Sequence, residues 1–446
     1  MDNGAGPRAT AALRQRDFVL LWSGQTVSLA GNGVFTVALP LEVLRLTGSS
    51  LDLALIVSAR TIPAVVLLLV GGTLVDRLPR RLVMLASDGC CGLSVGLVAV
   101  LIAAGRGRLW ELAALSAVFG VASAFFKPAA TAITPEVVPE GLLVAASSLS
   151  SLSQSLAQYL LGPLAGGVIV AATGTAWAFG IDAVSFAVSA GCLAAMRPVR
   201  RPALPRAPML DGIRDGLRYC RSQPWLWWSM IAVGVANFAC YVPLAVLEPL
   251  LVRRVFLAGP LALGVLYSAS GAGGALASVL AARWPAPRRP VIAIWAAWAG
   301  AGLAAVALGL APRVWVAVVF AGLTWCGVTY GNILWFPLMQ RTVPADMLGR
   351  ASSVDWALSL ALAPLGTIAA EAAAGLAGIR ATLIAGGAVA AATGAVLLNP
   401  AVTAMAGSVS PVPPRDARQE LSEDALSRQA RLSWSAEAHR GRGPGR

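Results

Sequence analysis

The chain has 446 residues, of which 57% are apolar and only 12% are charged. Soluble domains carry about 25% charged residues, because they must cover their surface with polar groups. The composition therefore excludes an ordinary soluble protein and indicates a membrane protein with many spans. The net charge of +13 does not require a nucleic-acid partner, because membrane proteins concentrate arginine in their cytoplasmic loops.

The sequence contains no pattern typical of a metal site or a cofactor site. The only histidine, His439, lies near the C-terminus, and the six cysteines lie at positions 90, 91, 192, 220, 240 and 326 without CxxC or metal-ligand spacing. We expect packing roles for the cysteines and no disulfide framework. The first apolar run is too long for a cleavable signal peptide.

A helix that crosses a bilayer needs about 20 apolar residues, and the chain contains twelve such runs. The pattern predicts an all-α membrane protein in which the fifth and sixth helices, and the eleventh and twelfth, form hairpins with very short turns. The predicted spans are 18–46, 51–75, 82–104, 109–133, 142–171, 175–196, 225–250, 260–282, 290–310, 313–338, 349–377 and 380–400.

The arginines predict the orientation of these helices. If the N-terminus is cytoplasmic, 26 of the 34 Lys and Arg residues lie in cytoplasmic segments and seven lie outside. Since positive residues favour the cytoplasmic side, we expect both chain ends in the cytoplasm of a bacterial cell, with the protein in its inner membrane.

The long segment 197–224 divides the chain into two sets of six helices. Its second part, 210–221, has helical spacing and is predicted to be an amphipathic helix at the membrane surface. Residues 401–446 are rich in Pro, Ser, Arg and Gly, a composition typical of disorder. The predicted units are a cytoplasmic segment (1–17), two six-helix bundles (18–196 and 225–400), the linker (197–224) and a cytoplasmic tail (401–446).

The two halves of the chain resemble each other. VPEGLLVAASS at 138–148 matches VPADMLGRASS at 343–353 without gaps, and the Arg80-Arg81 pair matches Arg288-Arg289 at nearly the same offset. Two matches at one offset indicate a duplication. Two six-helix repeats about an axis normal to the membrane are typical of transporters whose substrate path lies between the halves.

The loop between the second and third helices reads Gly72-x-x-x-Asp76-Arg77-x-x-Arg80-Arg81, which resembles the cytoplasmic-loop signature of the major facilitator superfamily. Other stretches are similar to its branch of enterobactin exporters and macrolide-efflux pumps: LLWSGQTVSLAGN (20–32), FFKPA (125–129), GIDAVSF (180–186) and GRASS (349–353). The resemblance covers roughly residues 10–400. It implies the major facilitator fold, transport of a small-molecule substrate and a working monomer.

The same loop is a candidate cytoplasmic gate. The resemblance implies that the end of the second helix meets the start of the eleventh across the interface between the halves. An acidic group near a helix N-terminus is stabilised by about 0.3–1 kcal/mol, so Asp76 would stabilise this contact. The alternative is that the arginines serve topology alone. The second-half loop has Ala282 in place of the acid, so we expect an asymmetric gate. The predicted gate residues are Gly72, Asp76, Arg77, Arg80 and Arg81.

The fifth helix contains GPLAGG at 162–167, which resembles the exporters' antiporter motif. Pro163 removes a backbone hydrogen bond and bends the helix. Gly162, Gly166 and Gly167 are expected to allow close packing against the other half. The match is partial, because Gln158 stands where the family pattern has glycine, and an ordinary kinked helix is the alternative.

Ionisable residues inside the spans are candidates for function. Arg60 and Asp182 are predicted to lie at a similar depth in the membrane. We expect Arg60 either to bind the substrate or to pair with a carboxylate such as that of Asp182. Many members of the branch have an acid where this chain has Asn32, and a neutral amide cannot carry a proton. If protons drive transport, the candidate carriers are Asp182, Asp355, Glu371 and Glu42.

The walls of the substrate cavity are predicted from polar and aromatic residues in the spans. This mixture suits an amphipathic molecule better than a sugar or an inorganic ion. The predicted cavity residues are Gln25, Asn32, Arg60, Phe125, Lys127, Asn237, Tyr241, Asn332 and Trp335.

The leading interpretation is a secondary exporter of small amphipathic compounds, with protons as the coupling ion. An importer of a nutrient or siderophore on the same fold is the first alternative. A membrane enzyme or receptor is the second, but it predicts a soluble domain or a clustered catalytic site that the sequence does not contain. The only lysine, Lys127, is followed by proline, so the chain has no P-loop for ATP.

Overall fold

The computed structural model describes residues 11–75, 79–139, 142–197, 209–283, 287–398 and 402. Within these residues the regular structure consists of helices, without strands. Eleven helices in this part of the chain are long and apolar enough to cross a membrane, and α3 (Ser50–Val75) is a further helix of 26 residues that packs among them. The predicted all-α membrane fold is confirmed.

The first half of the chain forms six rods, where a rod is one predicted span and consists of a single helix or of several helical segments end to end. The fifth rod is continuous through a π-helical segment, η2, and the bounds of all elements follow the predicted spans within a few residues. The elements are α2 (Arg16–Thr47), α3 (Ser50–Val75), α4 (Arg80–Ala103), α5 (Leu109–Val137), α6 (Leu143–Ser153), η2 (Gln154–Leu161), α7 (Gly162–Thr173) and α8 (Thr175–Ala195).

The second half begins with α9 (Met209–Ser222), the helix predicted at 210–221, and then forms six more rods. The first of these contains two π-helical segments, η3 and η4. The elements are α10 (Pro224–Ala236), η3 (Asn237–Tyr241), α11 (Leu244–Leu250), η4 (Leu251–Val255), α12 (Pro260–Arg283), α13 (Pro290–Leu310), α14 (Val314–Thr342), α15 (Ala345–Ala361), α16 (Ala363–Ala377), α17 (Ile379–Ala392) and the 3₁₀ segment η5 (Thr393–Leu398).

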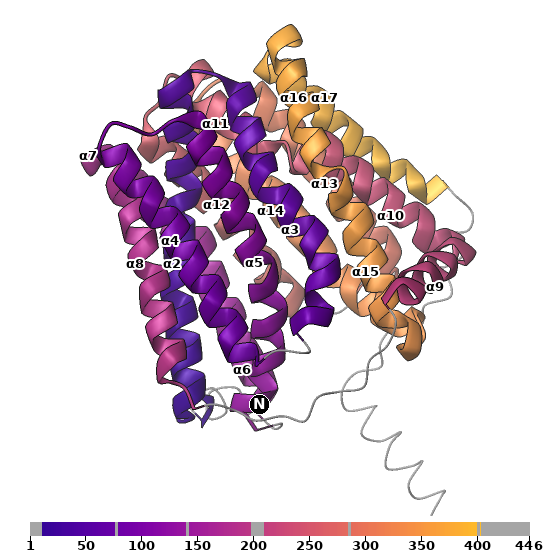
Figure 1. Cartoon of the computed structure of the whole chain (residues 1–446). Helices are drawn as coiled ribbons and strands as arrows, with labels where there is room; N and C mark the ends of the chain where they lie inside the picture. The colour runs from indigo at the N-terminus through magenta and orange to yellow at the C-terminus, as the bar shows by residue number, and fades with distance from the viewer. Residues whose placement is uncertain are drawn as a thin grey trace, which may run out of the picture.

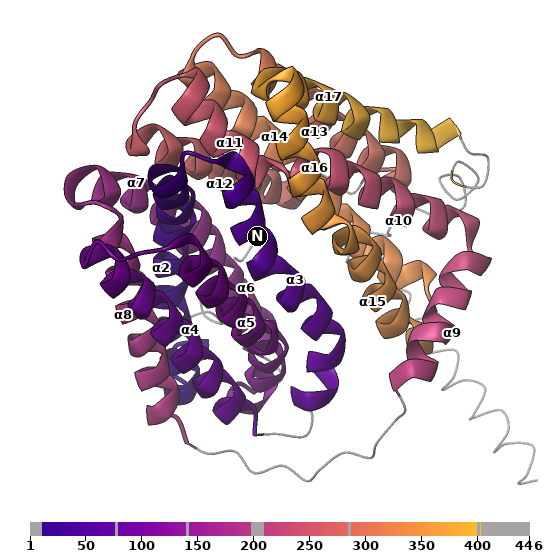
Figure 2. The same cartoon turned by 45° about the horizontal axis from the view of Figure 1, so that its top comes forward.

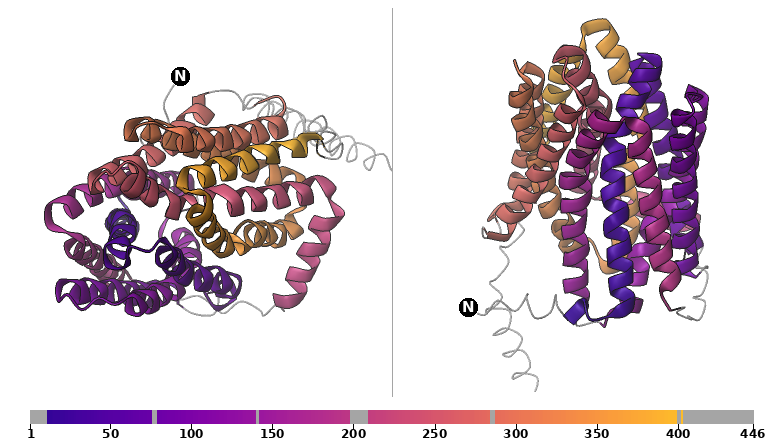
Figure 3. Two further views of the ribbon diagram at one scale, coloured as in Figure 1. Left: turned by 90° about the horizontal axis from the view of Figure 1, so that it is seen from above. Right: turned by 90° about the vertical axis from the view of Figure 1, so that its left-hand side faces the viewer.

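The rods form two bundles that lie side by side (Figure 1; Figure 3). Elements α2–α8, drawn indigo to magenta, make the first bundle, and α10–α17, drawn pink to yellow, make the second. We call the side where α2 and α10 begin the linker side and the opposite side the distal side. On the distal side Gly174 (φ 88°) and Gly378 (φ 91°) turn the chain between α7 and α8 and between α16 and α17. Such a φ is costly for other residues, so these glycines explain the two predicted hairpins.

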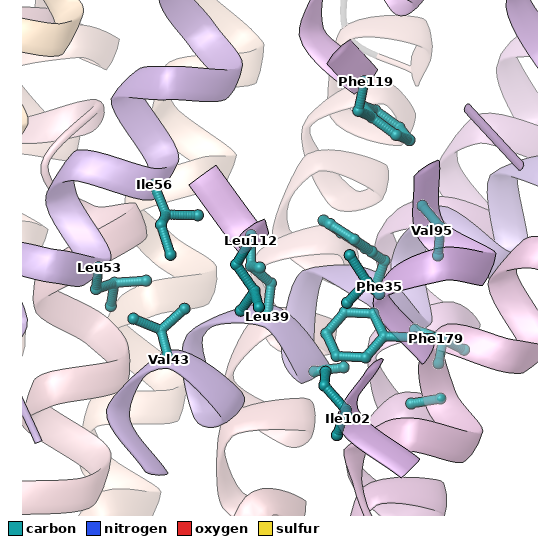
Figure 4. Packing of buried hydrophobic residues seen from close by; sticks show 14 of the residues in the cluster. Phe35, Leu39, Val43, Leu53, Ile56, Val95, Ile102, Leu112, Phe119 and Phe179 are labelled. Atoms are coloured by element: carbon teal, nitrogen blue, oxygen red, sulfur yellow. The ribbon is translucent and has the colours of Figure 1, made fainter. Parts of the chain in front are cut away.

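Aromatic rings fill the centre of the first bundle (Figure 4). Phe35 lies 5.8 Å from Phe119 and 5.5 Å from Phe179, measured between ring centroids, and all three side chains are buried. In a bilayer the lipid is as apolar as these rings, so close packing rather than exclusion of water holds the helices together.

The bundles contact each other along two helix pairs. One pair is η2–α7 with α12, and the other is α3 with α16, which run side by side between the bundles (Figure 2). A Cβ on Gly271 would lie 2.0 Å from the carbonyl oxygen of Tyr159 in the other bundle. This glycine therefore allows an approach between backbones that a side chain would prevent.

Hydrogen bonds also cross the interface, at mid-depth and on the distal side. Near mid-depth, Ser268 Oγ donates to the carbonyl of Leu160 at 2.7 Å. The hydroxyls of Ser58 and Thr367 lie 3.2 Å apart.

Closer to the distal surface the contacts involve charged groups. Ser50 Oγ donates to Glu371 Oε1 at 2.5 Å. Arg253 donates to the carbonyl of Leu41 at 3.2 Å, and its neighbour Arg254 donates to the carbonyl of Gly48. In this conformation the two bundles are joined on the distal side.

Candidate substrate cavities

The first bundle contains a cavity of about 670 Å³, a volume within the range of small-molecule sites. Helices α2, α3, α4, α5, α6 and α8, together with η2, line it. Three of the predicted cavity residues lie in its wall, which contains Gln25, Ser28, Asn32, Arg60, Thr61, Ser87, Asp88, Cys91, Phe119, Ser123, Phe126, Ser150, Ser151, Gln154, Gln158 and Phe186.

Arg60 is the cation of this first cavity. Its guanidinium carbon lies 4.1 Å from the ring centroid of Phe119 and 4.8 Å from that of Phe35. Such contacts stabilise a cation that is withdrawn from water. A Cβ on Gly120 would lie 2.1 Å from the carbonyl oxygen of Arg60, so this glycine lets α5 approach the turn of α3 that carries the arginine.

Asp182 lies behind the cavity wall. Its charge attracts that of Arg60, yet among the described residues the two groups form no ion pair within 4.0 Å. Asp182 is fully buried, with Oδ1 3.3 Å from Ser185 Oγ and Oδ2 without a hydrogen-bond partner. Gly31 of α2 leaves the space that both side chains occupy. The structure therefore places Asp182 in the packing of α8 against α2.

Asp88 is a cavity residue that was not among the predicted sites. It is 2% exposed and lines the first cavity. Its Oδ2 has no hydrogen-bond partner among the described residues, and the hydroxyl of Ser189 is a polar neighbour. The sequence signal was present, because an acid within a span is a functional candidate. Among the described residues, the cavity wall thus holds one cation, Arg60, and one anion, Asp88.

The second bundle contains a cavity of about 300 Å³. The four residues predicted from this half, Asn237, Tyr241, Asn332 and Trp335, all line it. Segment η3 carries Asn237 and Tyr241; π segments of this kind often occur at functional sites. The rest of the wall includes Trp295, Trp298, Trp325, Phe336, Asp355, Trp356 and Ser359.

The structure does not bring all predicted cavity residues together. Phe125 packs on the apolar cluster around Leu21 and Met84, whereas its neighbour Phe126 lines the first cavity. Lys127 belongs to α5, but its side chain lies outside the described residues. The predicted cavity residues thus fall into two groups, one in each bundle.

Two of the candidate proton carriers lie on the distal side, away from both cavities. Glu42 is fully buried, pairs with Arg45 at 2.6 Å and accepts a 2.5 Å hydrogen bond from Thr175. Glu371 accepts the hydrogen bond from Ser50 across the interface. The remaining candidate, Asp355, lines the second cavity.

The glycine motif of the fifth rod was predicted to face the other bundle, and this is correct only for Gly167. A Cβ on Gly167 would lie 3.2 Å from the Cα of Gly264 in α12. Gly162 and Gly166 instead pack on α2 of their own bundle, against Gly33 and the following residue. Gly162 and Gly166 are four residues apart and share one face of the helix, whereas Gly167 lies on another face. The motif therefore packs on α2 with one face and on α12 of the other bundle with the other.

The predicted gate lies only partly within the structure. Asp76 and Arg77 lie outside the described residues, and Gly72 is near the end of α3. Arg80 pairs with Glu136 at 2.7 Å, and Arg81 donates to the carbonyls at the end of α8 at 2.7 Å. Both arginines therefore join helices within the first bundle in this conformation.

The linker helix α9 attaches to the second bundle. Arg350 at the start of the eleventh rod pairs with Asp215 of α9 at 3.3 Å, and Gly216 packs directly against the same arginine. The pair is about half exposed, so its electrostatic contribution is small, and the close backbone contact determines where the helix lies.

The amino-acid sequence is similar to a known protein family and to individual proteins. The model of a family described as transmembrane secretion effector matches residues 8–429. The multidrug efflux pump Tap of Mycolicibacterium fortuitum is 30% identical over 372 residues, which cover 80% of this chain and 88% of that protein. The enterobactin exporter EntS of Citrobacter koseri is 26% identical over 343 residues, which cover 76% and 80%.

Solved structures share the fold at low identity. The nucleoside transporter NupG has a TM-score of 0.69 at 11% identity and covers 87% of this chain and 99% of its own. A bacterial homologue of the iron transporter ferroportin has a TM-score of 0.68 at 15% identity and covers 86% and 98%. Since these identities are low, the likeness shows the fold alone.

Proposed function

Since the chain belongs to the transmembrane secretion effector family of the major facilitator superfamily, we propose that it exports small amphipathic molecules by alternating access. As a member of this family it is a transporter and not an enzyme. The observation that carries the proposal is its similarity to a multidrug efflux pump and an enterobactin exporter over 76–80% of its length. Cavities in both bundles supply the binding space that such transport needs.

Alternating access requires two conformations that expose the substrate site to opposite sides of the membrane. The described conformation is joined on the distal side through contacts such as Ser50 with Glu371 and Arg253 with Leu41. Export requires these contacts to break while the linker side closes. The distribution of arginines supports a cytoplasmic linker side. We further propose that the protein lies in the inner membrane of a bacterial cell and acts as a monomer.

Proton-coupled antiport is the form of export that we propose. Glu371 is the carboxylate best placed to link protonation to closure, because it accepts its hydrogen bond across the interface. A carboxylate that takes up a proton loses acceptor capacity, which weakens the distal contact. Asp88 has an unpartnered oxygen at the first cavity, so it joins Asp182, Asp355 and Glu42 as a further candidate carrier.

We place the cytoplasmic gate in the loop that contains Asp76. When the linker side closes, this acid meets the start of the eleventh rod, where helix backbone N–H groups favour an anion. Arg80 and Arg81 hold α4 to its own bundle, so the loop moves as part of a rigid bundle.

Efflux from energised cells tests the proposal. Cells that make the protein and control cells are loaded with the neutral dye Nile red or the cationic dye ethidium, with and without a protonophore. We expect faster loss of at least one dye, and we expect the protonophore to abolish the difference. We also expect Asp76→Asn to abolish it with unchanged protein amounts. Equal dye loss from both cell types would contradict export of amphipathic molecules, and protonophore-resistant efflux would contradict proton coupling.

A further inference from the structure

Aromatic rings surround the second cavity. The indole rings of Trp298 and Trp335 have centroids 5.8 Å apart, and Trp295 meets Trp298 edge to face at 5.1 Å. Phe336 and Trp356 stack at 6.3 Å along another part of the wall. Helices α13, α14 and α15 bring these rings together from three rods of the second bundle.

One carboxylate lies among these rings. Asp355 is the only charged side chain among the described residues that line the cavity, and it is 7% exposed. Its Oδ2 accepts a 3.2 Å hydrogen bond from Trp335 Nε1. No Arg or Lys of the described residues lies within 4.0 Å of it. A buried carboxylate is stabilised by a proton or by a nearby positive charge, and no described side chain within 4.0 Å supplies that charge.

Three hydrogen-bond donors of the cavity already have partners inside the protein. Tyr241 Oη donates to the carbonyl of Trp298 at 2.8 Å, and Asn237 Nδ2 donates to the carbonyl of Ser359 at 3.1 Å. Trp335 Nε1 is engaged with Asp355. A bound molecule therefore meets ring faces, the acceptor oxygen of Asn237, the amide of Asn332 and the carboxylate.

We propose that the second cavity binds an organic cation, with its ammonium or similar group against Asp355 and its apolar part among the tryptophan rings. The faces of aromatic rings carry negative potential and attract cations, with Trp the strongest, and the carboxylate supplies the counter-charge. An anion would meet the carboxylate and the ring faces, both of which repel it. The inference rests on the proposed export function and names the class of molecule that this half of the transporter recognises.

Equilibrium dialysis with radiolabelled benzyltrimethylammonium tests the proposal on the full chain in nanodiscs, with empty nanodiscs as the correction for partitioning. We expect saturable binding that Asp355→Asn weakens at least tenfold, while Asp355→Glu retains most of it. The matched control is Asp52→Asn, which removes a carboxylate from the first turn of α3 and should leave the affinity unchanged.

A second ligand separates charge recognition from simple apolar binding. Neopentylbenzene has nearly the shape of benzyltrimethylammonium but no charge. We expect Asp355→Asn to bind it as well as the wild-type chain does, which also shows that the variant is folded. Equal affinity of the wild type and Asp355→Asn for the cation would overturn the proposal, and so would an equal loss of both ligands.

The binding result is independent of the efflux result. Export of Nile red together with no saturable cation binding would refute the cation site and leave the export function standing. Conversely, cation binding that depends on Asp355 in a protein that moves no dye would support the site and contradict export.

Discussion

Replacing Gly271 by alanine should force the two bundles apart near mid-depth. The new Cβ would lie 2.0 Å from the carbonyl oxygen of Tyr159, whereas ordinary contacts begin at 3.4 Å. The backbones must therefore separate by about 1.4 Å. The neighbouring hydrogen bond from Ser268 to Leu160, now 2.7 Å long, would stretch beyond hydrogen-bond distance.

The clash is present in the described conformation, whose bundles are joined, so its relief should favour a conformation in which the bundles separate at this contact. Overpacking of this kind costs about 1–3 kcal/mol, and a change of that size shifts a two-state equilibrium by about 5–150-fold. We therefore expect Gly271→Ala to increase the fraction of molecules that are open on the distal side.

Labelling of a cysteine at the interface between the bundles measures this fraction. Ser58 is 3% exposed and contacts Thr367 across the interface, so Ser58→Cys should react with a membrane-impermeant maleimide only when the distal side opens. We expect faster labelling in the Gly271→Ala background. Gly300→Ala is the matched control, because a Cβ there has no atom within 4 Å. Equal labelling rates in the two backgrounds would refute the reasoning.

Two further predictions concern the first bundle. Gly120→Ala should lower the free energy of unfolding by about 1–3 kcal/mol, because its Cβ would lie 2.1 Å from the carbonyl oxygen of Arg60. Gly89→Ala is the control and should leave the free energy of unfolding unchanged, since no atom lies within 4 Å of a Cβ there. Equal melting temperatures in detergent would contradict this. The pair of Arg80 and Glu136, with side chains 15% and 7% exposed, should show the asymmetry of buried ion pairs. Arg80→Met alone should destabilise by about 3–5 kcal/mol, and adding Glu136→Met should restore part of the loss. A double variant no more stable than Arg80→Met would refute the pairing argument.

The apolar runs of the sequence predicted the rods well, because a bilayer requires each span to satisfy its own backbone hydrogen bonds. The run predicted at 260–282 and the observed α12 (Pro260–Arg283) agree almost to the residue. Breaks inside a span were less visible. The segment QSLAQYLL (154–161) mixes polar and apolar residues as the preceding LVAASSLSSLS does, and nothing in its composition marks the π-helical segment there.

The lining of the cavities was predicted in part. Polar residues in the spans, such as Asn32 and Asn237, are unusual enough to stand out, and both line cavities. Trp295 and Trp298 did not stand out, because tryptophan in a span serves packing as often as binding. Only the three-dimensional arrangement shows that they adjoin Asp355. The direction of Gly162 and Gly166 likewise depends on how the rod is rotated, which their spacing does not define.

The π-helical segments have a consequence for insertions and deletions in this family. A π-helical segment holds one residue more than the α-helical path that it replaces. In an ordinary span the loss of one residue would turn everything beyond it by about 100°. Within Gln154–Leu161 such a loss would instead convert the segment to regular α-helix and leave both flanks in register. Relatives that differ by one residue here can therefore keep the same bundle interfaces and change only the two glutamines that face the first cavity.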